Sequence, residues 1–278
     1  MNKTILITGT SSGIGKATAK LFATKGWNVI ATMRSPENET ELTKMNRVFV
    51  TQLDVLNPKS IRSAIQIGIE KFGKINAIVN NAGYGEFGIF EAIREDKVQT
   101  QFEINVFGVM NTIRTILPHF RENKGGMIIN ISSGAGRFTL PLISLYAASK
   151  FALEGFSEAL SFELNALNIG VKIIEPGGTT TNFTKVSREK AVDNKSLEDY
   201  DDFLAATGKL FESMIDMGLA SAEDVAAVIY EAATDGKDTL RYAIGNEDFN
   251  KRIANRASML DQEYINSVKN SYLKFMKK

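Results

Sequence analysis

The chain has 278 residues, of which 44% are apolar and 23% are charged, a balance typical of one globular domain with a sizeable core. Its 33 basic and 32 acidic residues give a net charge of +1, so neither nucleic acid nor an anionic membrane is expected as a main partner. The absence of cysteine excludes disulfides, thiolate metal sites and cysteine nucleophiles. The N-terminal apolar run is too short for a signal peptide or a spanning helix, and a cytoplasmic protein is therefore expected.

Short and almost continuously apolar segments recur along the chain, separated by stretches of helical length. Such segments are typical of buried parallel strands, and they lie at 4–8, 28–33, 48–53, 75–80, 127–132 and 171–175. The alternation predicts an α/β fold of the Rossmann type, a doubly wound parallel sheet between two layers of helices. We expect residues 1–278 to form this single domain.

Helical spacing of apolar residues fills the intervals between the predicted strands. Pro58 opens one helix, in which Ile61, Ile65 and Ile69 recur one turn apart. Two longer apolar helices are predicted at about 96–120 and 146–167. A capping box at 221–224 begins a further helix, and a strand at 240–245 precedes a long polar C-terminal helix.

The turn after the first strand reads TGTSSGIG, residues 8–15, and is the first candidate site. Ligands of open parallel sheets bind at the carboxyl ends of the strands. Gly9, Gly13 and Gly15 allow a tight turn and close approach to a pyrophosphate, at which the following helix points its N-terminal N–H groups. The spacing departs from the Gly-x-Gly-x-x-Gly fingerprint, and a glycine-rich turn alone is a weak signal.

The only histidine, His119, follows a proline on an apolar helix, and a structural or solvent-exposed role is expected for it. Proton transfer near neutral pH would then need another side chain. Tyr146 and Lys150, in YAASK, are neighbours one helical turn apart. Such pairs are usually ordinary features of a helix surface, so the pair alone leaves both interpretations open.

Further motifs follow in order: NNAG at 80–83, Asn105 in INVFG, Ser133 in NISSG, then YAASK and PGG at 176–178. With them the chain resembles the compact, single-domain branch of the short-chain dehydrogenases/reductases, motif by motif over about residues 1–183. Stretches such as ATMR and EPGG are similar to hydroxysteroid and retinol dehydrogenases.

This resemblance implies roles for four residues. Tyr146 would be the acid/base, and Ser133, rather than its structural neighbour Ser132, would bond the substrate oxygen. Lys150 would bind the nicotinamide ribose and sustain the tyrosinate, while Asn105 would hold a water linking Lys150 to solvent. An ammonium about 4 Å from a phenolate is worth on the order of 4 kcal/mol at an effective dielectric of about 20, or roughly three pKa units at most.

The resemblance also implies a set of cofactor contacts, with the choice among residues 179, 180 and 181 left open. The set comprises Gly9, Ser11, Ser12, Gly13, Ile14, Gly15, Arg34, Asp54, Val55, Asn81, Ala82, Gly83, Tyr146, Lys150, Pro176, Gly177, Thr179 and Thr181. For some residues a structural role is the alternative. Asp54 could simply cap a turn, Asn80 could hold the central strands together, and Glu163 and Glu175 are expected to be ordinary helix and strand-end charges. The acidic run 196–202 is expected in a solvated loop or helix start.

The end of the second strand indicates which dinucleotide is bound. An acidic residue there usually binds the adenosine ribose of NAD, but here the position falls at or near Met33, and Arg34 follows. A guanidinium can make charge-assisted hydrogen bonds to a 2′-phosphate, so NADP(H) is expected.

The sequence thus predicts an NADP(H)-dependent alcohol dehydrogenase or carbonyl reductase that needs no metal. Its substrate would be an apolar or ring-containing alcohol or ketone, under a lid formed by 184–220. A homodimer or homotetramer is expected, because the two long helices are apolar on more than one face. The alternatives are a non-catalytic NADP-binding sensor or scaffold and a sugar-nucleotide epimerase, whose usual glycine spacing and larger C-terminal domain are missing.

Overall fold

The computed structural model describes residues 2–181, 183 and 197–276. Residues 184–196 of the expected lid lie outside the described residues. The remainder of that segment comprises a 3-10 turn at Glu198–Tyr200, helix α7 at Asp201–Asp216 and the start of the short strand β8 at Ala220–Ser221.

A seven-stranded parallel sheet forms the centre of the molecule, in the order β3-β2-β1-β4-β5-β6-β9. Its strands are β1 Thr4–Thr8, β2 Asn28–Met33, β3 Val48–Gln52, β4 Ala77–Asn80, β5 Gly126–Ile131, β6 Ile169–Pro176 and β9 Arg241–Ile244. The predicted doubly wound sheet is confirmed, with strand bounds close to those expected. A separate short pair joins β7, Thr179–Thr180, to β8.

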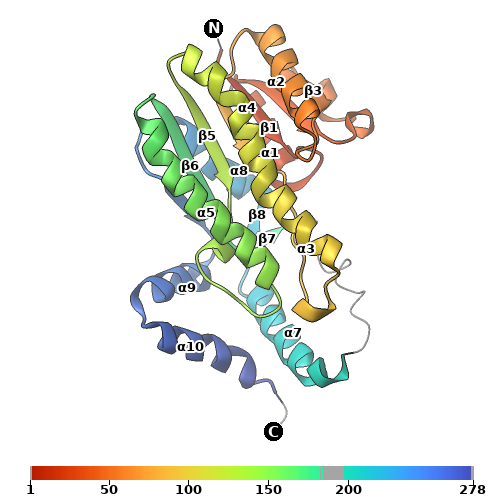
Figure 1. Ribbon diagram of the computed structural model, residues 1–278, viewed down its shortest axis with the longest axis vertical. Coiled ribbons are helices and arrows are strands. Elements are labelled where there is room, and N and C mark those ends of the chain that lie inside the picture. Colours follow the sequence, from red (N-terminus) through yellow and green to blue (C-terminus); the bar gives the residue numbers. More distant parts are fainter. Residues whose placement is uncertain (1, 182, 184–196, 277–278) are drawn as a thin grey trace.

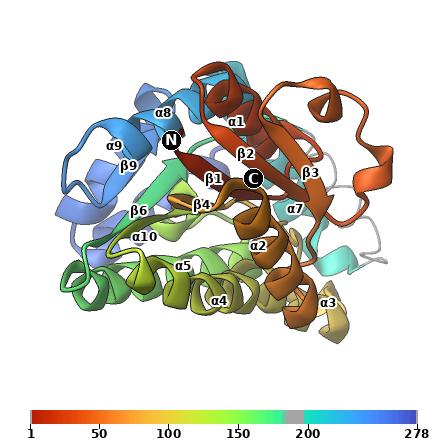
Figure 2. The same ribbon diagram turned by 90° about the horizontal axis from the view of Figure 1, so that it is seen from above.

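Helices cover both faces of the sheet, giving three layers (Figure 2). On one face lie α2 Pro58–Phe72, α4 Val109–Glu122 and α5 Ser144–Asn165; on the other lie α1 Gly13–Thr24 and α8 Ala222–Thr234. Two apolar cores result, one around Phe22 and Ile229 and the other around Ile113 and Leu153, all buried. The continuous apolar strands are explained by this burial on both faces.

Helix starts follow the capping signals in the sequence. Asn57 precedes Pro58 and accepts hydrogen bonds from the backbone N–H groups of Lys59 and Ser60 at 3.0 and 3.3 Å. The predicted capping box is present at α8, where Ser221 Oγ accepts from Asp224 N at 3.0 Å and Asp224 Oδ2 accepts from Ser221 N at 2.9 Å. These contacts satisfy N–H groups that a helix leaves unpaired.

The helix predicted at 96–120 is in fact interrupted. It consists of α3 Glu95–Phe102, a π-helical segment at Glu103–Gly108, and α4. Gly108 packs against Val55, since a Cβ at Gly108 would lie 2.9 Å from the Val55 Cβ. A π-helical turn adds a residue to the helix and is frequent at functional sites.

The C-terminal region also differs from its expected form, because the single long helix is two helices, α9 Glu247–Ser258 and α10 Asp261–Leu273. Each buries an aromatic side chain, Phe249 or Tyr264, in one cluster with Phe138. Burying both rings requires the chain to turn at Met259, which has an extended backbone. Figure 1 shows α7, α9 and α10 beyond the carboxyl ends of the strands.

Two polar side chains confirm structural roles expected from the sequence. Asn80 Nδ2 donates to Asn130 Oδ1 at 2.8 Å, linking β4 to β5, and Asn130 Nδ2 donates to Ser157 Oγ on α5 at 2.9 Å. His119 is buried, its Nε2 accepts from Ile75 N at 3.0 Å, and burial lowers its pKa. Ile75 lies before the first residue of β4, Ala77, although the sequence predicted a strand from residue 75.

The remaining short 3-10 turns lie at Pro36–Asn38, Leu42–Lys44, Phe90–Ala92 and Gly134–Gly136.

Candidate active site

The glycine-rich turn lies between β1 and α1, at the carboxyl edge of the sheet. Gly9 and Gly13 have positive φ angles of 73° and 55°, which glycine adopts without strain. Ser12, the N-cap of α1, makes no side-chain capping hydrogen bond, and the first turn contains no acidic residue. Ser11 and Ser12 are exposed. The turn thus presents uncapped N–H groups at a helix N-terminus, the arrangement that favours an anion.

The turn is packed too closely at Gly15, as it is at Gly9, to accept a side chain. A Cβ at Gly15 would lie 2.3 Å from Gly9 O and 2.4 Å from Asn81 Nδ2. Asn81 Nδ2 donates to Thr8 O at 2.9 Å and Gly9 O at 3.0 Å, and it thereby ties the turn to the end of β4. Ala82 N donates to Thr8 Oγ1 at 3.0 Å, fixing the same junction.

Asn105 joins three elements at the π-helical segment. Its Oδ1 accepts from Tyr84 N at 3.0 Å, and its Nδ2 donates to Tyr84 O at 2.8 Å and to Ser149 Oγ on α5 at 3.1 Å. Gly83 lies against it, because a Cβ there would be 3.1 Å from Asn105 Oδ1. The side-chain amide is therefore engaged by protein groups. It positions the loop after β4 against α5.

Ser133, Tyr146 and Lys150 come together at the ends of β5 and α5. Lys150 Nζ donates to Ile131 O, the last residue of β5, at 2.8 Å and lies 5.7 Å from the Tyr146 ring centroid. Ser133 follows β5 closely, and its hydroxyl lies near enough to Tyr146 to lower the pKa of the phenol. Ser133 Oγ also accepts from Ala135 N at 3.1 Å, which holds the turn.

Burial has the largest effect on the pKa values of both Tyr146 and Lys150. Burial raises the pKa of Tyr146 to about 12, and the Ser133 hydroxyl only partly opposes this. Burial lowers the pKa of Lys150 to about 8. Tyr146 is only 8% exposed, and the Lys150 ammonium is directed to Ile131 O, so the lowering of the Tyr146 pKa by Lys150 stays a prediction.

Two aromatic rings that the sequence did not single out cover Tyr146. Phe87, from the loop after β4, has its centroid 5.5 Å from the Tyr146 ring, and Phe183 lies 5.6 Å away. Both form an apolar cluster with Ile143. The motifs gave no signal for them, since neither belongs to a polar pattern.

The loop after β6 brings its expected residues to the same edge. Pro176 O accepts from Ser133 Oγ at 3.5 Å, and Gly177 N donates to Ile244 O at 2.7 Å. Thr181 lies beside the glycine-rich turn, with its Cγ2 3.4 Å from the position of a Cβ at Gly13. Thr179 Oγ1 instead donates to Gly177 O at 3.1 Å, so Thr181 is the better placed of the two.

The ends of β2 and β3 carry the remaining expected contacts. Arg34 is exposed directly after β2, and its backbone O accepts from Gln52 Nε2 at 3.1 Å. Met33 is 4% exposed and belongs to the core, so the residue after the strand, Arg34, faces outward. Asp54 Oδ1 accepts from Leu56 N at 3.0 Å, which is the turn-capping role considered for it, and Val55 is buried.

Glu175 is not an ordinary strand-end charge. It is 1% exposed, and its Oε1 lies 2.8 Å from Arg137 Nη1 and 3.3 Å from Arg241 Nε. Glu163, by contrast, is exposed on α5 as expected. The ionic cluster around Glu175 joins residues far apart in the sequence, which is why the sequence did not reveal it.

Comparisons with known proteins agree with this arrangement. Residues 3–192 match the family described as short chain dehydrogenase. An uncharacterized oxidoreductase of Schizosaccharomyces pombe is 40% identical over 216 residues, covering 77% of this chain and 89% of that protein. The chain belongs to the short-chain dehydrogenase family.

Two further relatives bear on the fold and on the reaction. The 3-ketodihydrosphingosine reductase of Bacteroides thetaiotaomicron is 38% identical over 208 residues, covering 75% of each chain. A short-chain dehydrogenase structure from Streptomyces avermitilis has a TM-score of 0.78 and 30% identity, covering 98% of this chain and 97% of that one. Among other solved structures of the same fold, one holds NAD and another NADP.

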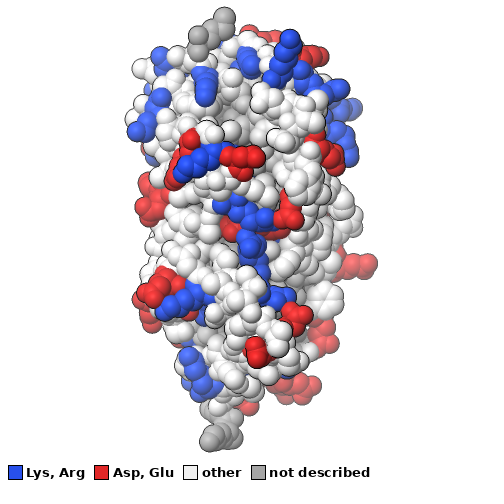
Figure 3. All heavy atoms as spheres, turned by 90° about the vertical axis from the view of Figure 1, so that its left-hand side faces the viewer, with Lys and Arg blue, Asp and Glu red and all other residues white. Residues whose placement is uncertain are grey.

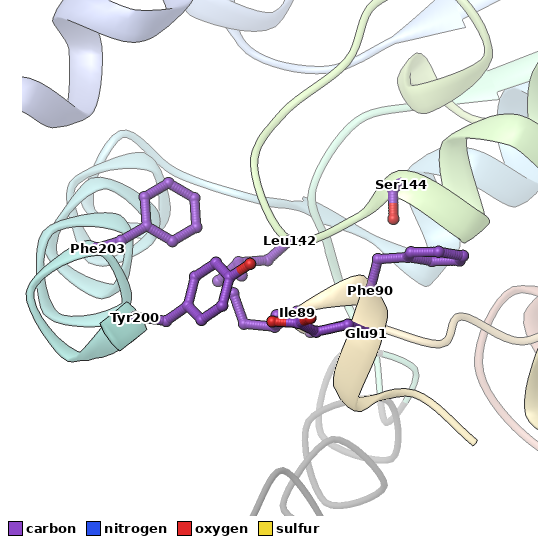
Figure 4. A pocket seen from close by; sticks show the side chains of 8 residues that line it. Ile89, Phe90, Glu91, Leu142, Ser144, Tyr200 and Phe203 are labelled. Atoms are coloured by element: carbon purple, nitrogen blue, oxygen red, sulfur yellow. The ribbon is translucent and has the colours of Figure 1, made fainter. Parts of the chain in front are cut away.

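A cavity of about 420 Å³ opens next to the start of α5 in this short-chain dehydrogenase. Figure 4 shows Tyr200 and Phe203 on one side of it and Phe90 and Ser144 on the other. Ile89 and Leu142 add apolar surface, while a hydrogen bond to the Glu91 carboxylate raises the pKa of Tyr200. Ser144, which lines the cavity, lies two residues before Tyr146 in α5, and the lining combines polar and apolar side chains.

The face of the molecule drawn in Figure 3 has no large patch of a single charge that would suit a charged partner. On the face drawn in Figure 3, basic and acidic side chains alternate in small groups. Within residues 2–181, 183 and 197–276, no helix combines the length and apolar character needed to cross a bilayer. Across those same ranges, no three His, Asp or Glu side chains gather as metal ligands would.

A dinucleotide fits the observed site of this dehydrogenase on structural grounds. The N-terminus of α1 has no side-chain cap and no acidic residue in its first turn, and Thr181 lies beside Gly13. These features suit a phosphate group, which needs N–H donors and close backbone approach.

Replacing Gly15 by Ala should disrupt the glycine-rich turn, since the new Cβ would overlap Gly9 O and Asn81 Nδ2. We expect a loss of at least about 2 kcal/mol in the free energy of unfolding, measured by urea denaturation followed by circular dichroism. Gly208→Ala on α7 is the matched control, because a Cβ there meets nothing within 4 Å. It should be neutral or stabilising by up to about 1 kcal/mol. Equal stability of Gly15→Ala and the unmodified protein would contradict the packing described.

Proposed function

We propose that the protein is an NADP(H)-dependent carbonyl reductase in which Tyr146 donates the proton. The main support for this proposal is that Ser133, Tyr146 and Lys150 lie close together, at the same edge of the sheet as the glycine-rich turn. A bound nicotinamide dinucleotide would supply the hydride. An NADP-binding sensor or scaffold would not need these three side chains together, so catalysis is favoured.

The protonation states support the direction of reduction. With a pKa of about 12, the Tyr146 phenol keeps its proton throughout the neutral range and can donate it to a carbonyl oxygen that is being reduced. Ser133, whose hydroxyl is close to Tyr146, would hold that oxygen. Lys150, fixed by Ile131 O, would bring a positive charge near the phenolate left behind. Asn105 holds the helix of Tyr146 against the loop after β4.

The proposed substrate is a ketone or aldehyde with an apolar body. Phe87 and Phe183 surround Tyr146, and the neighbouring cavity is lined by Ile89, Phe90 and Phe203. Such rings favour an aliphatic or ring-containing group beside the carbonyl. The Bacteroides relative is named a 3-ketodihydrosphingosine reductase, which agrees with a ketone substrate. NADPH oxidation with a panel of aliphatic and cyclic ketones would identify the preferred class.

Tyr146→Phe tests the proton donor. We expect turnover of a ketone substrate to fall at least about a hundredfold, because the phenol proton is lost while the ring remains. Binding of cofactor, followed by nucleotide fluorescence, should persist. Tyr230→Phe serves as the control, since Tyr230 packs against Phe22 on the other face of the sheet. Near-normal turnover in Tyr146→Phe would refute the proposed role.

Arg34→Ala tests the choice of NADP(H). The exposed guanidinium at the end of β2 would bond the 2′-phosphate with about 1.5–3 kcal/mol, so its loss should weaken NADPH binding roughly ten- to hundredfold. NADH binding should change little. Met33 is unsuitable for an acidic replacement, because it is buried in the core.

Fluorescence titration with both nucleotides would measure these affinities. Arg62→Ala, which removes an exposed arginine on α2, is the control and should leave both affinities unchanged. If the unmodified protein bound NADH more tightly than NADPH, the assignment would fail.

We further propose that the protein associates through α5 and the π-helical segment that precedes α4. The apolar residues first expected on two faces are mostly buried against the sheet; Val106, Val109, Ile113, Leu153, Leu160 and Leu164 all lie inside. The outer face instead carries Phe107, Phe151 and Phe162, with exposed fractions of 54%, 42% and 75%. Three exposed rings on neighbouring segments suit a two-fold contact.

Light scattering should therefore give at least twice the mass of one chain at micromolar concentration. Phe151→Glu combined with Phe162→Glu should reduce the mass to that of a monomer, since buried like charges would face each other. Phe90→Glu, which changes an exposed ring of the cavity lining rather than one on α5, should leave association unchanged. A monomer in the unmodified protein would rule out this interface.

A further inference from the structure

Glu154 is a buried carboxylate outside the expected catalytic set. It lies one helical turn after Lys150 on α5 and is 4% exposed. Its Oε2 is 3.0 Å from Arg241 Nε on β9. Burying an ionised carboxylate is costly unless it is paired, so its presence beside the catalytic lysine calls for a physical reason.

Arg241 joins Glu154 to a larger charged cluster. Its Nη2 is 2.6 Å from Glu158 Oε2, on the exposed side of α5, and its Nε is 3.3 Å from Glu175 Oε1. Glu175 is also paired with Arg137. Glu175 therefore has two cations near it, and the half-exposed Glu158 is solvated. Glu154 is the carboxylate that remains with one close cation and a buried, unpaired oxygen.

That unpaired oxygen lies on the side of the active site. Glu154 Oε1 and Ser132 Oγ are both buried and, among the described residues, make no regular hydrogen bond. Burial raises the pKa of the Glu154 carboxyl, and Ser132 and Arg241 partly oppose this rise. Gly136 marks the contact, because a Cβ there would lie 2.8 Å from Glu154 Cγ, 2.9 Å from Ser132 Oγ and 3.2 Å from Lys150 O.

The geometry places Glu154 where it can act on the lysine. Lys150 donates to Ile131 O, and Ser132, the next residue, borders Glu154. The end of β5 thus lies between the Lys150 ammonium and the Glu154 carboxylate. Glu154 opposes the lowering of the Lys150 pKa by burial, and Arg241 in turn favours the ionised form of Glu154. Between opposite charges in a protein interior, this attraction persists beyond direct contact.

We infer that Glu154, held ionised by Arg241, is the counter-charge that keeps Lys150 protonated at neutral pH. It is a positioning residue, since it acts on the reaction through Lys150 and does not touch the reacting atoms. The inference concerns the charge of Lys150, and its importance for catalysis rests on the proposed carbonyl reductase activity. The charged groups facing Glu154 are Lys150 on α5, Arg241 on β9 and Glu175 on β6, with Glu158 and Arg137 at the edges of the cluster.

Nuclear magnetic resonance of the lysine side-chain nitrogens tests this directly and requires no turnover. The Lys150 signal is assigned by its loss in Lys150→Met, and its pKa is measured in the unmodified protein and in Glu154→Gln. We expect a decrease of about one unit in the variant, because the opposite charge is removed. Glu158→Gln, which removes the exposed partner of the same arginine, should leave the Lys150 pKa unchanged. Equal Lys150 pKa values in Glu154→Gln and the unmodified protein would overturn the inference.

A second variant keeps the test decisive if Glu154→Gln does not fold. Arg241→Gln removes the cation beside Glu154 and should also lower the Lys150 pKa, because the carboxyl then takes up a proton more readily. An unchanged Lys150 pKa in Arg241→Gln would count against the proposal in the same way.

The pH dependence of kcat/KM separates this inference from the proposed function. In Glu154→Gln the alkaline limb of ketone reduction should move to lower pH by about the same one unit, since Lys150 loses its proton earlier. Absence of turnover in the unmodified protein, with a shifted Lys150 pKa in the variant, would reject the reductase activity and leave the charge pairing intact. Normal, Tyr146-dependent turnover with an unshifted pKa would reject the pairing alone.

Discussion

The amide of Asn81 fixes the spacing on which the whole site depends. It bonds both Thr8 O and Gly9 O, so the end of β4 and the turn after β1 are held at one distance. Gly15 must then approach Gly9 O so closely that no side chain fits between them. The direction of the first turn of α1 follows from this packing. The ends of β5 and β6 are placed relative to that edge through the parallel ladder β1-β4-β5-β6.

Burial acts on the two central side chains in opposite directions, and this governs the chemistry that they can perform. Removal of water favours the neutral form of both groups, so the Tyr146 pKa rises and the Lys150 pKa falls. At neutral pH the phenol is therefore protonated, which is the form that a proton donor needs. In the same low-polarity surroundings charges interact over longer distances than in water, so the Glu154 carboxylate can act on the pKa of Lys150 without direct contact.

The sequence predicted the sheet well, because each strand is buried on both faces and is therefore apolar almost throughout. It also singled out Ser133, Tyr146 and Lys150, because they lie in two short motifs, one just after β5 and the other on α5, and their catalytic roles stay a prediction. It did not predict the π-helical turn at Asn105 or the break near Met259, which depend on packing against Val55 and on the aromatic cluster of Phe138. The ionic cluster was missed because Arg241 and Glu154 are 87 residues apart, and residue patterns reveal only local spacing. The pKa of Tyr146 could not be predicted, since it depends on rings contributed by two separate loops.

Phe249, on α9, makes the final packing of the site depend on the C-terminal region of the chain. A Cβ at Gly134, Gly177 or Gly245 would lie 2.3, 2.9 or 2.4 Å from the Phe249 ring, so the loops after three strands are shaped around this one side chain. The loop at Gly134 follows Ser133, and the loop at Gly177 follows Pro176. On the ribosome, the residues of the site emerge well before residue 249. The site therefore reaches its final packing only after α9 has left the exit tunnel, late in the synthesis of the chain.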